Sequence, residues 1–137
     1  TMEDGKGDER STIDRLMTAL RSLVEETGAG LIIISHLRKT DSKSCPFEQG
    51  GSISMDDLRG SGSLKQLPDT IIAAERNQQA EDEGGRNKLR LRLLKCRFTG
   101  ETGLADAIRF DKKTNRLHPI DPLDTTDTEG EEDACPF

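Results

Sequence analysis

The sequence predicts an α/β domain, and three features support this fold class. A helical pattern over residues 11–27 is followed directly by the apolar run LIIIS at residues 31–35, which is typical of a parallel strand covered by helices on both faces. A second apolar run, TIIAAER at residues 70–76, predicts that the sheet continues. The alternating run KLRLRLLK at residues 88–95 predicts an antiparallel hairpin at its edge.

The first helix is predicted from the spacing of its apolar residues. These recur with the helical period at Ile13, Leu16, Met17, Leu20, Leu23 and Val24. Ser11 with Asp14 resembles a capping box, and Gly28 or Gly30 is expected to end the helix.

A polar loop is predicted between the two apolar runs. It extends from Leu37 to Asp57 and contains the glycine pair of EQGGSIS; a loop of this length is usually functional or disordered. The following stretch, DLRGSGSLKQLPD at residues 57–69, predicts a short helix that stops at Pro68.

The hairpin is predicted from alternation and turn residues. Leu89, Leu91 and Leu93 share one side of its first strand, and LADAIRF at residues 104–110 is expected to be the second. Arg90 and Arg92 are interpreted as charges that prevent aggregation at a sheet edge.

Composition indicates one modest domain with a lean core. The 137 residues include 31% apolar and 34% charged residues, four Phe, and neither Trp nor Tyr, so another surface is expected to complete burial. Neither a signal peptide nor a transmembrane run is recognisable, which predicts a soluble, cytoplasmic protein. The three cysteines lack the spacing of a disulfide framework or a zinc site, and no metal site is predicted.

Charge divides the chain at residue 119. The net charge is −6, but the stretch from Pro119 to Phe137 contains seven acids and no base, which leaves the remainder at +1. We therefore expect a domain over residues 1–118 and a disordered acidic tail over residues 119–137.

Two sets of residues are candidates for binding phosphate. His36 follows an apolar run, where ligands bind in open α/β sheets, although a surface histidine is an equally good interpretation. Lys95 and Arg97 lie two residues apart, so on a continuing strand they share a face and could clamp one anion. Taken alone, they could equally be solvated edge charges.

The cations of the polar loop, with the exposed amides of DLRGSGS, suit a nucleic-acid backbone better than bases, although a solvated loop has the same composition. The sequence contains no glycine-rich phosphate loop that ends in Lys and Ser or Thr. The chain alone is therefore not expected to hydrolyse a nucleotide.

Several motifs, taken in order, resemble the helicase half of the phage T-seven type primase-helicases. These are DERSTIDRLMTAL, IIISHLRK, DLRGSGSLKQLPDTIIAAERNQQ, LLKCRFTGETG and an acidic tail that ends in Phe, and they cover almost the entire chain. That family belongs to the DnaB-type hexameric helicases with a RecA-like fold. The resemblance implies the C-terminal part of a ring motor that translocates on single-stranded DNA and unwinds the duplex at a replication fork. ATP or dTTP with Mg²⁺ would bind between subunits, with the phosphate-loop and metal ligands outside this chain.

The resemblance also implies residue roles. His36 matches the phosphate-sensing histidine, and Arg97 matches the arginine finger with Lys95 beside it. Arg76 is expected near the subunit interface and Phe110 against the nucleotide base. The residues matched to DNA contacts are Arg38, Lys39, Lys43, Arg59, Gly60, Ser61, Gly62 and Lys65.

The acidic tail with its terminal Phe137 resembles the segment that contacts the replicative DNA polymerase in the phage replisome. Its ending, DACPF, departs from the family pattern, as does Pro68.

Two further interpretations stay open at this point. One is a non-catalytic DNA- or polymerase-binding module from a split gene, and the other is a recombinase of the RecA type. A partial RecA-like fold is expected to leave Ile32 to Ile34 uncovered, which favours a helicase fragment over the stand-alone module.

Overall fold

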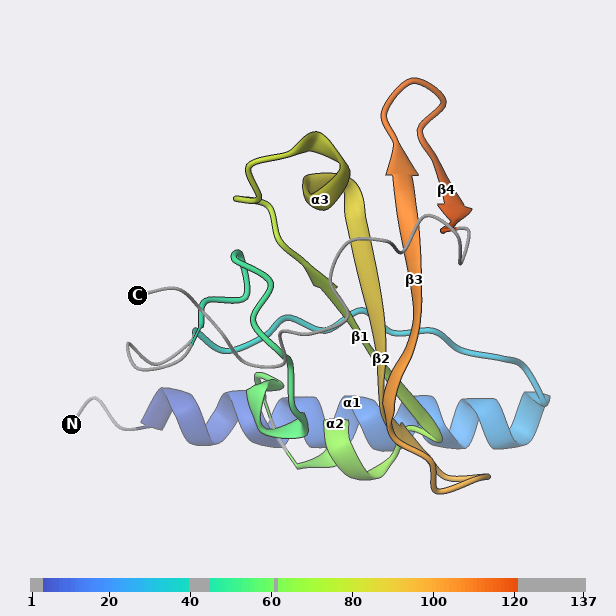
Figure 1. Cartoon of the computed structure of the whole chain (residues 1–137). Coiled ribbons are helices and arrows are strands. Elements are labelled where there is room, and N and C mark those ends of the chain that lie inside the picture. Colours follow the sequence, from blue (N-terminus) through green and yellow to red (C-terminus); the bar gives the residue numbers. More distant parts are fainter. Residues whose placement is uncertain (1–3, 40–44, 61, 121–137) are drawn as a thin grey trace.

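A four-stranded antiparallel sheet forms the body of the chain (Figure 1). The computed structural model describes residues 4–39, 45–60 and 62–120. The strands are β1 (Thr70–Arg76), β2 (Lys88–Cys96), β3 (Gly103–Asp111) and β4 (Arg116–Pro119). They pair in chain order, each antiparallel to the next, so short turns connect every neighbouring pair except β1 and β2.

The predicted hairpin is confirmed. In β2, Leu91 pairs with Ala74 on β1 and with Asp106 on β3, so β2 lies inside the sheet. The prediction that Arg90 and Arg92 protect a sheet edge is therefore wrong, since the edge strands of the described sheet are β1 and β4. Residues 70–76 form a strand as predicted, but it runs antiparallel to β2.

The predicted first helix is confirmed as α1 (Asp4–Thr27), and it begins earlier than expected. Ser11 therefore lies inside the helix, and the capping box that it resembles is not the helix start. Gly28 ends the helix with φ +67, a conformation that glycine adopts easily, and its N–H donates to the Val24 carbonyl at 2.9 Å.

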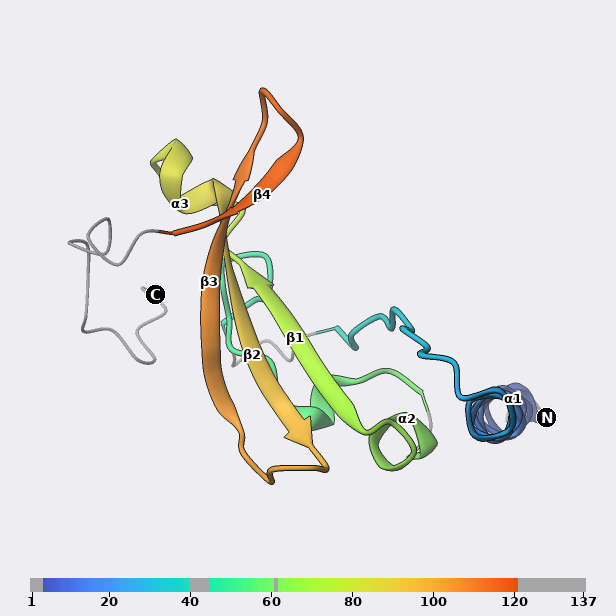
Figure 2. The same cartoon turned by 90° about the vertical axis from the view of Figure 1, so that its right-hand side faces the viewer.

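The short helix predicted before Pro68 is α2 (Ser63–Gln66). It lies between α1 and the end of the sheet where β1 begins, so that α1 contacts α2 and does not cover a face of the sheet (Figure 2).

Residues 31–35 are not a strand. Ile32 and Ile34 are 93% and 91% exposed, and the segment makes no β-bridge before Leu37, which pairs with Leu58. β-Branched residues favour an extended backbone, but a strand also needs a neighbour for its N–H and C=O groups, and the described residues supply none here. The predicted parallel arrangement is accordingly absent from the described part of the chain.

Three short elements were not predicted. The 3₁₀ turn η1 (Met55–Asp57) and helix α3 (Glu83–Asn87) lie in stretches that read as polar loops. Helix α3 is capped by Asp82, whose side chain accepts from the Gly85 N–H at 2.6 Å. Strand β4 follows Asn115, which adopts φ 54 in the turn after β3.

The core is small, in agreement with the composition. Among the described residues, the buried apolar side chains are those of Met17, Ile53 and Ala73. The fully buried Glu75 lies two residues from Ala73 on β1 and accepts from the Ile53 N–H. The predicted disordered tail lies outside the described residues.

Candidate functional site

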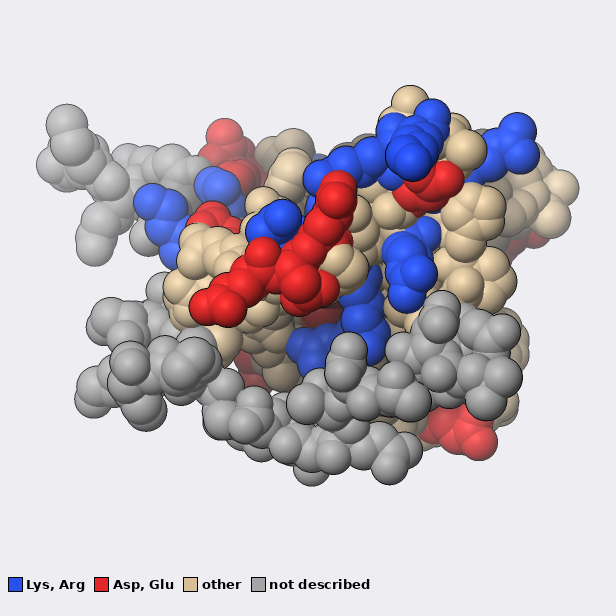
Figure 3. Space-filling model, turned by 45° about the horizontal axis from the view of Figure 1, so that its top comes forward, with Lys and Arg blue, Asp and Glu red and all other residues tan. Residues whose placement is uncertain are grey.

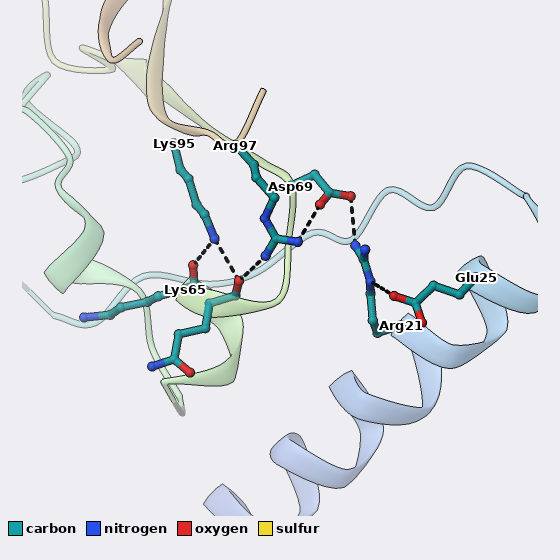
Figure 4. Close-up of polar contacts among 7 residues, drawn as sticks. Arg21, Glu25, Lys65, Asp69, Lys95 and Arg97 are labelled. Carbon is teal, nitrogen blue, oxygen red and sulfur yellow. Dashed lines mark hydrogen bonds and ion pairs between the residues drawn. The ribbon is translucent and has the colours of Figure 1, made fainter. Parts of the chain in front are cut away.

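Lys95 and Arg97 converge on the end of helix α2. The Lys95 ammonium donates to the carbonyls of Lys65 and Gln66, each at 2.8 Å, and Arg97 Nη2 donates to the same Gln66 carbonyl at 2.9 Å (Figure 4). These are last-turn carbonyls of α2, which have no partner within the helix. The two cations meet on one face, as expected for a continuing strand, although β2 ends at Cys96 and Arg97 lies in the turn after it. Their roles toward a nucleotide stay predictions.

Asp69 links this pair of cations to α1. One carboxylate oxygen accepts from Arg97 Nη1 at 3.0 Å, and the other accepts from Arg21 Nη1 at 2.9 Å. Arg21 in turn pairs with Glu25 at 2.7 Å, one turn along α1. Both carboxylates raise the pKa of Arg21, with the hydrogen bond to Glu25 as the larger cause.

Lys95 is half-buried at this site. Burial lowers the pKa of its ammonium below the usual range, and the nearby positive charge of Arg97 lowers it further, while Asp69 opposes the change. The carbonyls that surround Lys95 are neutral, so they hold the ammonium without cancelling its charge. Asp69 therefore pairs with both Arg21 and Arg97, and Lys95 lies beside Arg97 on the Gln66 carbonyl.

The segment that contains His36 pairs with the segment matched to DNA. The Arg59 N–H donates to the His36 carbonyl at 3.1 Å, and the Arg38 N–H donates to the Asp57 carbonyl at 2.8 Å. The Arg38 guanidinium also donates to the Asp56 carbonyl. His36, Arg38 and Lys39 are all exposed beside this bridge.

Lys65 and Arg59 have acidic partners on the described surface. Lys65 Nζ contacts Asp56 at 2.7 Å, and this hydrogen bond is the main reason why the pKa of Asp56 lies below its usual value. Arg59 lies 3.9 Å from Glu9 on α1 and stays two-thirds exposed. In each pair at least one side chain is exposed to solvent, so a phosphate can compete with the acid for the cation.

The backbone conformation and close packing at Gly60 favour glycine at this position. Its φ is +127, and a Cβ there would come within 2.7 Å of Leu64 Cδ1 and 3.3 Å of Ile13 Cδ1. Gly62 has ordinary dihedral angles and open space around it. Lys43, Ser61 and Phe137 lie outside the described residues.

Arg76 and Phe110 lie at the other end of the sheet from Arg97. Arg76 is the last residue of β1, and its guanidinium donates to the Arg86 carbonyl at 2.6 Å. Phe110 pairs with Leu117 near the end of β3. The seven residues of β1 span about 20 Å, so the two ends cannot contact the same phosphate.

Acidic and basic side chains are interleaved over the end of the molecule that carries α3 and the β3–β4 turn (Figure 3). Lys112 pairs there with Glu83 at 3.2 Å.

Three residues of the network were not predicted: Arg21, Glu25 and Asp69. The buried Glu75 on β1, which lies outside this network, was not predicted either. Glu75 is the acid inside the apolar run TIIAAER, and its unusual place among Ile and Ala was the one signal in the sequence. Asp69 and Arg21 are 48 positions apart, and no local pattern relates them.

Across the described ranges, no group of three or more His, Cys, Asp or Glu could hold a metal ion. A search of the same ranges for a helix long and apolar enough to cross a membrane found none.

Comparison with known proteins supports the resemblance stated above. No protein-family profile matches the chain. The chain is 48% identical over 129 residues to the DNA helicase/primase of Enterobacteria phage T3, a match that covers 94% of this chain and 22% of that protein. The chain thus spans about a fifth of the length of this relative. We conclude that the chain is a relative of the phage T-seven type primase-helicases and corresponds to one segment of them.

Proposed function

We propose that this chain is the C-terminal part of a RecA-like domain in a replicative ring DNA helicase. Its motor would couple hydrolysis of ATP or dTTP with Mg²⁺ to translocation on single-stranded DNA and to duplex unwinding at the fork. One observation carries the proposal: Lys95 and Arg97 bind the last turn of α2, a helix that directly follows Gly62 and contains Lys65, both assigned to DNA. One short helix thereby connects the cations assigned to the nucleotide with the segment assigned to DNA.

A second connection supports coupling between nucleotide and DNA. The main chain of His36, the assigned phosphate sensor, is hydrogen-bonded to Arg59 of the DNA segment. A displacement of His36 by a γ-phosphate would pull directly on the backbone of Arg59. Arg38 and Lys39 continue from His36 into the assigned DNA loop.

The separation of the assigned nucleotide contacts supports a ring of subunits. Arg97 and Arg76 lie about 20 Å apart along β1, so within one subunit they would serve different nucleotides. We assign Phe110 and Arg76 to the nucleotide of their own subunit and Arg97, as a finger with Lys95, to that of the neighbour. This arrangement suits the hexamer expected of the family.

The exposed run at Leu31 to Ile34 supports a RecA-like domain that is completed by other residues. Alternating side chains are about 45% and more than 90% exposed, which is costly for four consecutive apolar residues. We propose that this run is a parallel strand in the complete domain, as its composition predicts.

The acidic tail adds a partner to the proposal. Its seven acids can compete with DNA for basic surfaces, and Phe137 can anchor it on the replicative DNA polymerase. This part of the proposal rests on the sequence.

The test is nucleotide hydrolysis by the full-length gene product. Arg97→Ala should abolish DNA-stimulated hydrolysis, because the finger stabilises charge only in the transition state, while nucleotide binding stays nearly intact. Lys113→Ala, at the opposite end of the sheet, is the matched control. Undiminished hydrolysis in Arg97→Ala would remove the finger assignment, and a full-length product without any hydrolysis would favour a non-catalytic binding module.

A further inference from the structure

Asp69 holds Arg97 through both its main chain and its side chain. The Arg97 N–H donates to the Asp69 carbonyl at 2.8 Å, and Arg97 Nη1 donates to the carboxylate at 3.0 Å (Figure 4). The Gln66 carbonyl fixes the other terminal nitrogen at 2.9 Å. The plane of the guanidinium is therefore defined from two sides.

These contacts leave Arg97 able to bind an anion. A guanidinium has five N–H groups, and the contacts to Asp69 and Gln66 occupy only part of them. The Arg97 side chain is 46% exposed, whereas Asp69 is 34% exposed. The exposed N–H groups of the guanidinium can thus bind a phosphate while Asp69 stays hydrogen-bonded to Arg97.

Arg21 fixes Asp69 in turn. It binds the carboxylate oxygen that Arg97 does not use, at 2.9 Å, and is itself aligned by Glu25. Because Arg21 and Glu25 lie on the long helix α1, the orientation of Asp69 is set by an element outside the sheet. Lys95 shares the Gln66 carbonyl with Arg97 and contacts neither Arg21 nor the Asp69 carboxylate directly.

We propose that Asp69 is a positioning residue that aims the Arg97 guanidinium, and that Arg21 orients Asp69 for this task. The inference rests on the proposed role of Arg97 as the finger. A guanidinium that is already held loses little rotamer freedom when the phosphate arrives, and small misplacements of such groups are costly to the rate. Asp69 itself touches no reacting atom.

The test uses steady-state and single-turnover hydrolysis by the full-length gene product with single-stranded DNA. Asp69→Asn keeps the shape of the side chain, but an amide has one acceptor oxygen and cannot hold both guanidinium groups. We expect kcat to fall about tenfold and KM for the nucleotide to change by less than about twofold, because ground-state binding is unaffected. Arg21→Gln should lower kcat by a smaller factor, about threefold, because Asp69 keeps its contact with Arg97.

Glu83→Gln is the matched control, since it removes the exposed pair with Lys112 far from Arg97 and should leave kcat unchanged. Thermal unfolding of each variant checks that folding is retained, and Arg21→Gln provides the test if Asp69→Asn fails to fold. In the Arg97→Ala background, Asp69→Asn should cause no further loss of the residual single-turnover rate, because Asp69 acts only through Arg97.

The outcomes separate the two proposals. If Arg97→Ala loses hydrolysis but Asp69→Asn keeps the full kcat, the positioning role is wrong and the finger assignment stands. A further loss on adding Asp69→Asn to Arg97→Ala also overturns the positioning role. Full hydrolysis by Arg97→Ala overturns both.

Discussion

Glu75 on β1 accepts a hydrogen bond from Arg92 Nε on β2 at 2.7 Å, and the Glu75 side chain has no exposed surface. The same oxygen accepts from the Ile53 N–H at 2.9 Å. The second oxygen has no hydrogen-bond partner among the described residues, and Arg90 Nη2 lies 3.6 Å from it. Arg90 also donates to the Gly50 carbonyl at 2.7 Å, so the three charges fasten residues 50–53 to the sheet.

We expect Glu75→Ala to lower the free energy of unfolding by roughly 2–4 kcal/mol, because it leaves Arg92 and the Ile53 N–H without their partner. Arg92 is 28% exposed and can regain some hydration, which limits the loss. Urea denaturation of the chain measures this change. Glu83→Ala, which removes an exposed acid, is the control and should cost under about 0.5 kcal/mol; equal losses in the two variants would contradict a structural role for Glu75.

A pair of neighbouring glycines gives a second test. Gly60→Ala places a Cβ against Leu64 and Ile13 at φ +127, and we expect it to destabilise the chain by about 1–3 kcal/mol. Gly62→Ala meets nothing within 4 Å at ordinary dihedral angles and should be neutral or slightly stabilising. Thermal unfolding of both variants under the same conditions decides the matter, and equal melting temperatures would show that the Gly60 backbone is free to change.

The sequence predictions were accurate where the structure depends on residues close together in the sequence. The helix ending at Gly28, the hairpin of β2 and β3, and the convergence of Lys95 with Arg97 all follow from periodicity and turn residues within a short stretch. Residues 31–35 were predicted as a strand from composition, but strand formation depends on a neighbour that no local pattern supplies.

The missed parts of the site have a similar explanation. Asp69 and Arg21 meet only because α1 lies against α2, and such a tertiary contact is invisible in either stretch alone. Arg90 and Arg92 looked like edge charges because the buried acid that they accompany lies on the neighbouring strand. The sequence therefore shows that these positions are charged, but it does not show which residues they pair with.

The surface around His36 and Arg59 predicts a salt-dependent contact with DNA. In the full-length gene product, Arg38→Ala and Arg59→Ala should each weaken binding of single-stranded DNA and reduce the slope of log K against log salt by about 0.7, the value for one lost phosphate contact. Lys112→Ala, whose charge is paired with Glu83 at the opposite end, should leave the slope unchanged. Titrations of labelled oligonucleotide at several salt concentrations measure it, and an unchanged slope in both arginine variants would exclude this surface from the DNA path.

Cys96 provides a probe of the turn that follows β2. Its thiolate is stabilised by hydrogen bonds from the Thr99 hydroxyl, the largest cause, and from the backbone N–H groups of Thr99 and Phe98, and these lower the pKa of the thiol below its usual range. A lowered pKa means that the reactive thiolate appears at a lower pH than in an ordinary cysteine. In a Cys45→Ser, Cys135→Ser background, the midpoint of the pH profile for alkylation should therefore lie below that of a free cysteine.

Thr99→Val removes the largest of these causes, so it should move the midpoint of the Cys96 profile back toward higher pH. Thr102→Val, an exposed position in the same connection between β2 and β3, should leave it in place. Rates of iodoacetamide reaction across the pH range, followed by intact mass, measure both variants. A midpoint that Thr99→Val does not move would mean that the turn after Arg97 is not held closed in solution, because only the closed turn brings the Thr99 hydroxyl to the sulfur.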